Sequence, residues 1–262
     1  MSKTLHKELY SGTGNTFVLV DNRTRFIQDG AGEAKVLCHQ HKVDGLLLME
    51  KPTEKADIRM RIFNPDGSEA EMCGNGSRCA AHWAHTKAGL PAKMLIQTGA
   101  GVLQAEVKGN IAKIRLTEPH DFGRPGKTEL NGKQLEMLFI NTGVPHVAVP
   151  VESVEGIDVN KEGRRIRHDD RFQPKGTNVS FFQKVKPNEI RAYTYERGVE
   201  AQTQSCGTGS AACALIASVI HGFTSPVKVQ TASGDTLNIY FKRNGESFSD
   251  VYLEGPVKVL KP

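Results

Sequence analysis

The sequence predicts an α+β fold of two pseudo-symmetric domains, each a curved or barrel-like, mostly antiparallel sheet wrapped around a central helix. Three observations predict it. The chain has 262 residues, more than a single hydrophobic core usually holds together. Its short β-rich segments fall into two sets, and each set surrounds one clear helix. A glycine-rich sequence, MCGNGSRC at residues 72–79, returns as SCGTGSAAC at residues 205–213.

The predicted strands are short apolar or alternating segments bounded by Gly, Pro, Asn and Asp. The first set covers residues 16–21, 45–50, 57–64, 94–98, 102–107 and 112–117. The second set covers residues 136–142, 146–151, 178–185, 189–196, 227–232, 236–242 and 250–255.

One helix is predicted in each set. The first covers residues 77–88 and ends at Gly89, with Pro91 just beyond it. The second covers residues 208–221 and ends at Gly222. The second helix is apolar nearly all round, so it must be buried on every side. Strands wrapped around it are the simplest way to bury it, and the alanine-rich first helix suits the same arrangement.

A cluster of Pro and Gly at residues 118–126 predicts a linker between the domains. The N-terminal domain then covers residues 1–118, completed by a C-terminal strand at 252–262, and carries Cys73. The C-terminal domain covers residues 119–251 and carries Cys206.

Composition and charge argue against nucleic acid and membrane partners. A net charge of +5 is spread along the chain without a long basic block, so we expect no nucleic acid partner. No segment approaches the roughly 20 apolar residues of a membrane helix, and the N-terminus has no secretory pattern. We therefore expect a cytoplasmic protein without a membrane partner. Five cysteines in that compartment are expected to be free, and Cys38 is predicted to be a buried structural thiol.

Each repeated cysteine lies on a glycine-rich turn just before a predicted helix. Unpaired N–H groups and the positive end of the helix dipole bind anions there, and they lower the pKa of a nearby thiol from about 8.5. Glycines at positions 74, 76, 207 and 209 allow a ligand to approach the backbone closely. Each loop is thus a predicted anion cradle beside a reactive thiol.

Two such loops predict a reaction with two faces. If the domains face each other about a local twofold axis, the thiols of Cys73 and Cys206 lie on opposite sides of one cleft. Inversion of a stereocentre without a cofactor needs a base on one face of the carbon and an acid on the other. A carboxylate held by two helix N-termini would have its developing enediolate charge stabilised. The two thiols would act as a coupled acid/base pair.

Other interpretations of the cysteines are weaker. Either loop alone could be an ordinary helix entry, but a matched pair is much less expected by chance. A disulfide between Cys73 and Cys206 is disfavoured by a reducing cytosol. Zinc binding by Cys73, Cys79, His82 and His85 is disfavoured because the helix that carries three of them must be covered by the core. We therefore expect no metal.

Four segments together resemble diaminopimelate epimerase over nearly the whole chain. They are YSGTGNTFVLVD at 10–21, NPDGSEAEMCGNGSRC at 64–79, TGVPHVAV at 142–149 and YERGVEAQTQSCGTGSAAC at 195–213. The resemblance implies a cofactor-free, pyridoxal phosphate-independent isomerase that interconverts LL- and meso-diaminopimelate for lysine and peptidoglycan precursors. It also implies the fold predicted above, and it leaves a homodimer open.

The resemblance implies roles for particular residues. Cys73 and Cys206 would be the catalytic pair. The substrate-binding residues would be Asn15, Asn64, Gly74, Asn75, Asn178, Glu196, Arg197, Gly207 and Thr208. Among them, the backbone of residues 74, 75, 207 and 208 would hold the carboxylate at the reacting centre. Glu196 and Arg197 would suit a distal ammonium and carboxylate. Asn15 and Asn64 could instead be ordinary turn residues, because NPDG is a turn signal in its own right.

The chain departs from the family pattern at two positions that affect specificity. Val144 stands where the family usually has an asparagine, and Gly45 stands where some members have a glutamine. Both changes remove a polar contact, so looser distal recognition and additional racemisation of glutamate form an alternative hypothesis.

Further alternatives are a proline or hydroxyproline racemase-type isomerase and a non-catalytic amino acid binding protein. The racemase group typically has a histidine where this chain has Asn75.

Overall fold

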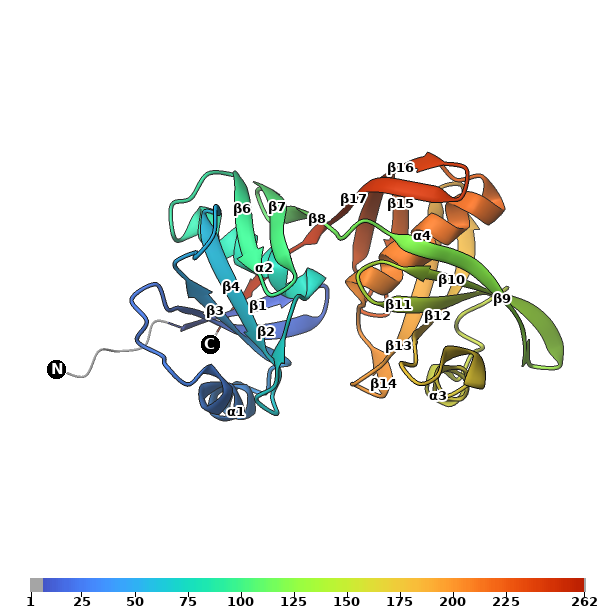
Figure 1. The fold of residues 1–262 in the computed structure, drawn as a ribbon, viewed down its shortest axis with the longest axis horizontal. Coiled ribbons are helices and arrows are strands. Elements are labelled where there is room, and N and C mark those ends of the chain that lie inside the picture. The colour runs from blue at the N-terminus through green and yellow to red at the C-terminus, as the bar shows by residue number, and fades with distance from the viewer. Residues whose placement is uncertain (1–6, 262) are drawn as a thin grey trace. The chain divides into compact units, whose positions relative to one another are not determined.

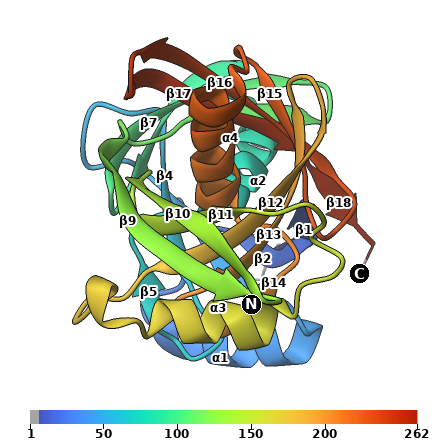
Figure 2. The same cartoon turned by 90° about the vertical axis from the view of Figure 1, so that its right-hand side faces the viewer.

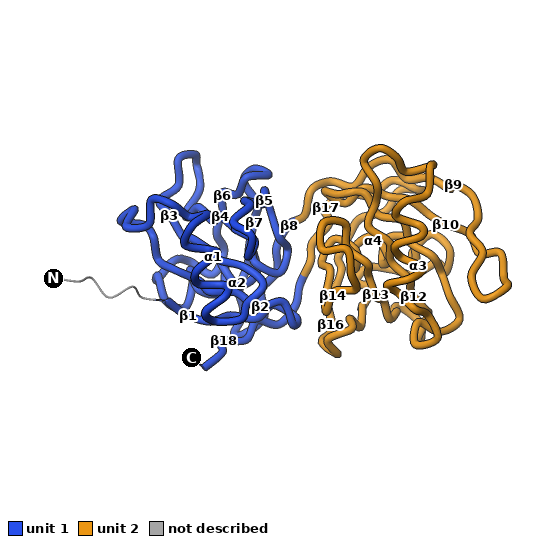
Figure 3. Tube along the Cα trace, turned by 90° about the horizontal axis from the view of Figure 1, so that it is seen from below, with its two compact units in different colours: residues 1–115, 254–262 blue, residues 116–253 orange. Residues whose placement is uncertain are grey.

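A computed structural model describes residues 7–261. The chain divides into two compact units, residues 1–115 with 254–262 and residues 116–253 (Figure 3). Strand β17 (Ser247–Pro256) runs from the second unit into the first. Each unit is therefore continuous except for the C-terminal segment, which returns to unit 1.

Unit 1 combines strands with two helices (Figure 1). Its helices are α1 (Gly30–His41) and α2 (Gly74–Thr86). Its strands are β1 (Lys7–Gly12), β2 (Asn15–Asp21), β3 (Gly45–Glu50), β4 (Ile58–Phe63), β5 (Glu69–Ala70), β6 (Lys93–Thr98), β7 (Gly101–Lys108), β8 (Ile111–Arg115) and β18 (Lys258–Leu260).

Unit 2 has helices α3 (Val159–Arg167) and α4 (Gly207–His221), with a 3₁₀ turn, η1 (Asp170–Phe172), after α3. Its strands, besides the first part of β17, are β9 (His120–Leu130), β10 (Lys133–Asn141), β11 (Pro145–Pro150), β12 (Asn178–Lys186), β13 (Glu189–Glu196), β14 (Ala201–Thr203), β15 (Val227–Gln230) and β16 (Thr236–Asn244).

The two units repeat the same strand pairing. In unit 1, β1 is antiparallel to β2, β2 is parallel to β3, and β3 is antiparallel to β4, which pairs in parallel with β6. In unit 2, β10, β11, β12, β13 and β15 pair in the same order and the same directions. An outer helix connects each first parallel pair, and an inner helix connects each second one. The cysteine loops therefore occupy equivalent places in two copies of one topology.

The inner helices α2 and α4 lie inside their sheets. Helix α2 contacts β1 to β4 and β6 to β8, and α4 contacts β10 to β13, β15 and β16. Figure 2 shows α4 enclosed by the strands of its own unit. The residues from Ala211 to Ala217 are fully buried, as an all-apolar helix requires. A fully buried Leu or Ile side chain contributes about 1.5–3 kcal/mol, so this enclosure stabilises each unit substantially.

The outer helices α1 and α3 cover the other face of each sheet. Helix α1 packs on β2, β3 and β4 through Ala34, Leu37 and Cys38, and these residues form one core cluster with the strands. Helix α3 packs on β12, β13 and β14 through Val159 and Ile166. Gly163 lies between them, where a Cβ would clash with the Cβ of Tyr195 on β13. The glycine thus allows α3 to lie directly on the sheet.

The structure confirms the predicted fold class of two similar α+β halves, each a sheet around a central helix. Both predicted inner helices are present, but they begin earlier than expected, at Gly74 and Gly207, because the glycine-rich loops are themselves the first helical turns. Cys38 is buried, as predicted, and it lies in α1.

One expectation about connectivity was wrong. Residues 118–126 are not a plain linker, because β9 begins at His120 and pairs with β10. Their Pro and Gly residues coincide with irregularities in that pairing, which is how a strand accommodates them. Helices α1 and α3 were also missed, because only one helix was predicted in each set. The arginine-rich sequence of α3 has only a narrow apolar face. Among residues 7–261, no helix combines the length and apolarity needed to cross a membrane.

The close packing of α3 on β13 predicts the effect of Gly163→Ala. A methyl group at this position usually favours a helix by about 1 kcal/mol, but here it collides with an atom held by the strand backbone. Overpacking of this kind costs about 1–3 kcal/mol, so we expect a lower free energy of unfolding in urea. Gly156→Ala is the matched control, because its Cβ meets no described atom within 4 Å. Equal stability of the two variants would contradict the packing described for α3.

Candidate active site

Cys73 and Cys206 are the N-cap residues of the two inner helices. Both have extended backbones, and each sulfur accepts a hydrogen bond from an N–H group of the first helical turn. The distances are 3.5 Å from Gly76 N to Cys73 Sγ and 3.3 Å from Gly209 N to Cys206 Sγ. The cysteine carbonyls accept the next N–H groups, from Ser77 and Ser210. Each sulfur therefore faces the positive end of a helix, which favours an anionic acceptor.

In unit 1, the turn between β1 and β2 lies against the Cys73 loop. The Cys73 thiol donates to Asn15 Oδ1 at 3.8 Å. A Cβ on Gly12 would lie 2.9 Å from the carbonyl oxygen of Asn75, so the turn can approach the loop only because this residue is glycine. Asn15 and Asn75, both predicted from the sequence, therefore lie beside the partly exposed Cys73.

A fully buried arginine, Arg78, supports this arrangement through its hydrogen bonds. Arg78 Nη2 donates to Asn75 Oδ1 at 2.6 Å and to Thr13 Oγ1 at 3.0 Å. Its Nη1 donates to the carbonyl oxygen of Pro256 at 3.2 Å. One guanidinium group thus links the cysteine loop, the β1–β2 turn and the C-terminal segment of unit 1. The fork of donors on arginine suits this task, whereas lysine would present a single charged point.

In unit 2, Cys206 is buried beside Glu196 and Thr208. The Cys206 thiol hydrogen-bonds to the Glu196 carboxyl group, which also accepts from Thr203 Oγ1 at 2.5 Å. Burial raises the pKa of Glu196, although both hydrogen bonds oppose the shift. The hydroxyl group of Thr208 lies 3.5 Å from Cys206 Sγ. The sequence assigned Glu196 to a distal group of the substrate, but its carboxyl group contacts the cysteine itself.

His146 is a buried residue near Cys206 that was not singled out from the sequence. Its Nε2 lies 2.9 Å from Thr208 Oγ1, and Thr142 Oγ1 donates to the Thr208 carbonyl oxygen at 3.0 Å. Burial lowers the pKa of His146 to about 3, and the nearby charge of Arg197 adds to the shift. The imidazole is therefore neutral at physiological pH, and it orients the hydroxyl group next to Cys206.

Asn178 and Arg197 lie together at the ends of β12 and β13. Asn178 Oδ1 accepts from the backbone N–H of Arg197 at 2.8 Å, and its Nδ2 donates to the carbonyl oxygen of Pro145 at 3.1 Å. The Arg197 guanidinium donates to the carbonyl oxygen of Lys175 at 2.8 Å. Asn178 thus holds the backbone that presents Arg197.

Asn64 forms its hydrogen bonds within its own turn. Its backbone N–H and its Nδ2 both bond to Ser68, at 2.8 Å and 3.0 Å. It follows β4 as Arg197 follows β13, so the two residues occupy equivalent places in the repeated topology. These contacts agree with the turn interpretation and leave its recognition role a prediction.

The cysteines and histidines of α2 do not form a ligand set. Cys79 is fully buried, His82 packs edge-on against Tyr10, and His85 Nδ1 contacts the carbonyl oxygen of Leu90. Within residues 7–261, no group of three or more His, Cys, Asp or Glu side chains could hold a metal ion.

Two supporting residues carried a signal that could have been used. Arg78 is a charged side chain in a helix whose neighbours are small and buried, so it had to have partners. His146 lies in an apolar strand, and a buried polar residue in such a place needs a hydrogen bond. Their partners, however, lie far away in sequence, and only the structure identifies them.

The low pKa of His146 predicts part of the acid sensitivity of the protein. In the unfolded chain this histidine takes up a proton near its ordinary pKa of 6.5, and in the folded state only at about 3. The unfolded state therefore binds more protons between these values, and stability falls as pH drops, by up to about 1.4 kcal/mol per pH unit. His146→Gln removes the titrating group but can still reach Thr208, so we expect a shallower loss of stability between pH 6.5 and 4.5.

Urea unfolding of both proteins across this pH range measures the difference, and contributions of other groups cancel in the comparison. Parallel curves for the wild type and the variant would contradict a neutral buried His146.

Comparisons with known proteins agree on one family. The family model described as diaminopimelate epimerase matches residues 8–120 and 138–260. A diaminopimelate epimerase from Aquifex aeolicus is 43% identical, over 94% of this chain and 92% of that protein. One from Chlamydia muridarum is 40% identical, over 98% of this chain and 93% of that protein.

Solved structures share the fold at low sequence identity. A phenazine biosynthesis protein of the PhzF family from Bacillus anthracis has a TM-score of 0.76 at 17% identity, covering 99% of this chain and 98% of that one. A hydroxyproline epimerase from Agrobacterium vitis has a TM-score of 0.65 at 14% identity, covering 98% and 89%. The fold is thus shared more widely than the sequence, and on the family match and the high identity to its relatives, the chain belongs to the diaminopimelate epimerase family.

Proposed function

We propose that the protein is a diaminopimelate epimerase, an isomerase that interconverts the LL and meso forms by proton transfer between two cysteines. The observation that carries the proposal is the presence of a thiol at the N-cap of each inner helix, in two copies of one topology. Neither of these two cysteines forms a disulfide bond. Its membership of the diaminopimelate epimerase family supplies the substrate class.

The reaction follows from the chemistry of these groups. One sulfur, as a thiolate, removes the proton from the α-carbon of the substrate, and the electron pair of the broken C–H bond moves into the carboxylate. The other sulfur, as a thiol, delivers its proton to the opposite face of the same carbon. The first cysteine ends as a thiol and the second as a thiolate, so protons and charge balance, and the pair is ready for the reverse reaction.

The helix N-termini stabilise the charge that develops during this step. The first N–H groups of an α-helix have no partner within the helix, and here they belong to residues 74, 75, 207 and 208. Donors that are already oriented at a developing oxyanion give the largest single contribution in many enzymes, with about 10²–10³-fold in rate per donor. We assign the substrate carboxylate at the reacting centre to these groups.

The remaining residues provide recognition. Asn15 lies beside Cys73, and Arg197 follows the strand that presents Glu196. A guanidinium group binds a carboxylate through two parallel hydrogen bonds, so Arg197 suits the distal carboxylate of the substrate. Asn178 fixes the backbone of Arg197, and Asn64 occupies the equivalent place in unit 1.

Separate replacement of the two catalytic cysteines tests the mechanism. Neither face of the carbon can lack its acid or base, so we expect Cys73→Ala and Cys206→Ala each to reduce epimerisation by about 10²–10⁴-fold. Epimerisation in deuterated water, with deuterium incorporation at the α-carbon, measures the effect from each stereoisomer. Cys38→Ala is the control, because this thiol is buried in α1 and burial raises its pKa to about 11. A wild-type rate in either catalytic variant would exclude the two-cysteine mechanism.

The same assay separates two alternatives. A non-catalytic binding protein would bind diaminopimelate without incorporating deuterium into it. Racemisation of L-glutamate, suggested by Val144, stays a prediction, and the absence of glutamate turnover at high enzyme concentration would eliminate it.

A further inference from the structure

The turn between β13 and β14 determines where Arg197 lies. The strands pair up to Glu196 and Ala201, and the residues between them form the turn. The Glu200 N–H donates to the Glu196 carbonyl oxygen at 2.8 Å and closes it. Glu200 has a positive φ of 58°, which is unfavourable for a residue with a side chain. Such a conformation persists only where other contacts enforce it.

The Glu200 carboxylate supplies such contacts. It accepts from the Gly198 N–H at 2.9 Å, within the turn, and from Tyr195 Oη at 3.0 Å, on β13. It also accepts from Arg167 Nε, on α3, at 2.7 Å. Although partial burial opposes the shift, these hydrogen bonds lower the pKa of Glu200 to about 2, so the group is charged at any pH of interest. A single carboxylate thus connects the turn, the strand and the outer helix.

Helix α3 makes a second connection to the same hairpin. The backbone N–H of Gln202, on β14, donates to Asn160 Oδ1 at 2.7 Å. Both ends of α3 therefore contact the hairpin, the N-terminal end through Asn160 and the C-terminal end through Arg167. Between these points, Gly163 packs against Tyr195.

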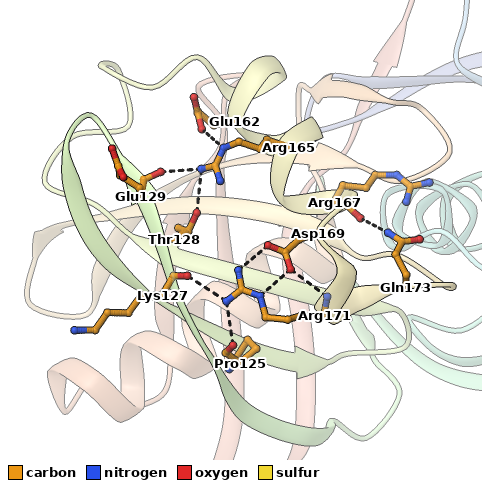
Figure 4. Close-up of polar contacts among 10 residues, drawn as sticks. All are labelled: Pro125, Lys127, Thr128, Glu129, Glu162, Arg165, Arg167, Asp169, Arg171 and Gln173. Atoms are coloured by element: carbon orange, nitrogen blue, oxygen red, sulfur yellow. Dashed lines mark hydrogen bonds and ion pairs between the residues drawn. The ribbon is translucent and has the colours of Figure 1, made fainter.

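Residues of α3 and of the 3₁₀ turn η1 also bind strand β9, as Figure 4 shows. Arg165 Nη2 donates to Thr128 Oγ1 at 3.0 Å and to the Glu129 carbonyl oxygen at 2.8 Å, both on β9. Arg171, held by Asp169, donates to the carbonyl oxygens of Pro125 and Lys127 at 3.2 Å and 3.1 Å. These contacts with β9 hold α3 and η1 in place, so the helix that carries Arg167 is a fixed support for Glu200.

We propose that Glu200, through its ion pair with Arg167, is a positioning residue that holds the turn so that Glu196 faces Cys206 and Arg197 faces the substrate. The inference rests on the proposed function for the role of Arg197. A surface ion pair alone contributes little to stability, but this one also fixes a backbone N–H and a tyrosine hydroxyl group. Its effect therefore falls on the geometry of the turn rather than on the overall fold.

A double-mutant cycle with Glu200→Gln and Arg167→Met tests the proposal. We expect each variant to raise KM for diaminopimelate by about tenfold with a smaller change in kcat, because a shift of about 1 Å in a binding group has effects of up to 10²-fold. The double variant should be no worse than either single one, since both remove the same interaction. The control is Glu162→Gln, which loses an ion pair with Arg165 on the same helix but does not touch the turn.

Hydrogen exchange of the turn provides a readout that does not require activity. We expect the amides of residues 197–203 to exchange faster in Glu200→Gln and Arg167→Met than in the wild type and in Glu162→Gln. Thermal unfolding confirms that the variants are folded. If the wild type does not epimerise diaminopimelate, the proposed function fails, and the exchange result alone decides the role of Glu200. Unchanged exchange overturns the positioning role, as does an unchanged KM in an active enzyme.

Discussion

The enclosure of an apolar helix by a sheet is the constraint on which the rest of the structure depends. Helix α4 has no polar face, so strands must surround it. Its N-terminus therefore lies at one end of the surrounding sheet. The first N–H groups of the helix then need partners from the loop that enters it. A cysteine at the N-cap meets this need with its carbonyl oxygen and its sulfur, and the same is true for α2. Folding therefore places each thiol at a helix N-terminus.

Much of this arrangement could be predicted from the sequence because it depends on local pattern. Helix α4 has apolar or small residues over nearly its whole surface, α2 is rich in alanine, and the glycine-rich loops before both helices repeat. Most strands also have clear turn signals at their ends. The predicted helices begin too far along the chain, because Gly is a poor helix former and the sequence gives no helical signal at Gly74 or Gly207.

The features that were not predicted from the sequence depend on contacts between distant segments. Helix α3 has only a few apolar residues, and its arginines are explained by β9 and by the β13–β14 turn, not by their own neighbours. Strand β9 contains Pro and Gly, which favour a loop locally, but pairing with β10 overrides this preference. His146 and Thr208 are 62 positions apart and meet only through the pairing of β11 with its neighbours. No local pattern contains this information.

The duplicated half-sites share their backbone and differ in their support. In both, the residue two positions after the cysteine contacts a buried basic side chain, Arg78 for Asn75 and His146 for Thr208. The arginine lies on the same helix and is permanently charged, whereas the histidine lies on a strand and its burial keeps it neutral. An anion cradle made of N–H groups requires only the backbone, so the Cys-Gly-x-Gly-Ser pattern is preserved in both copies. The side chains behind it need only hold that backbone, and two different solutions satisfy this requirement, which is why the repeat is visible in the loops and not in the residues that support them.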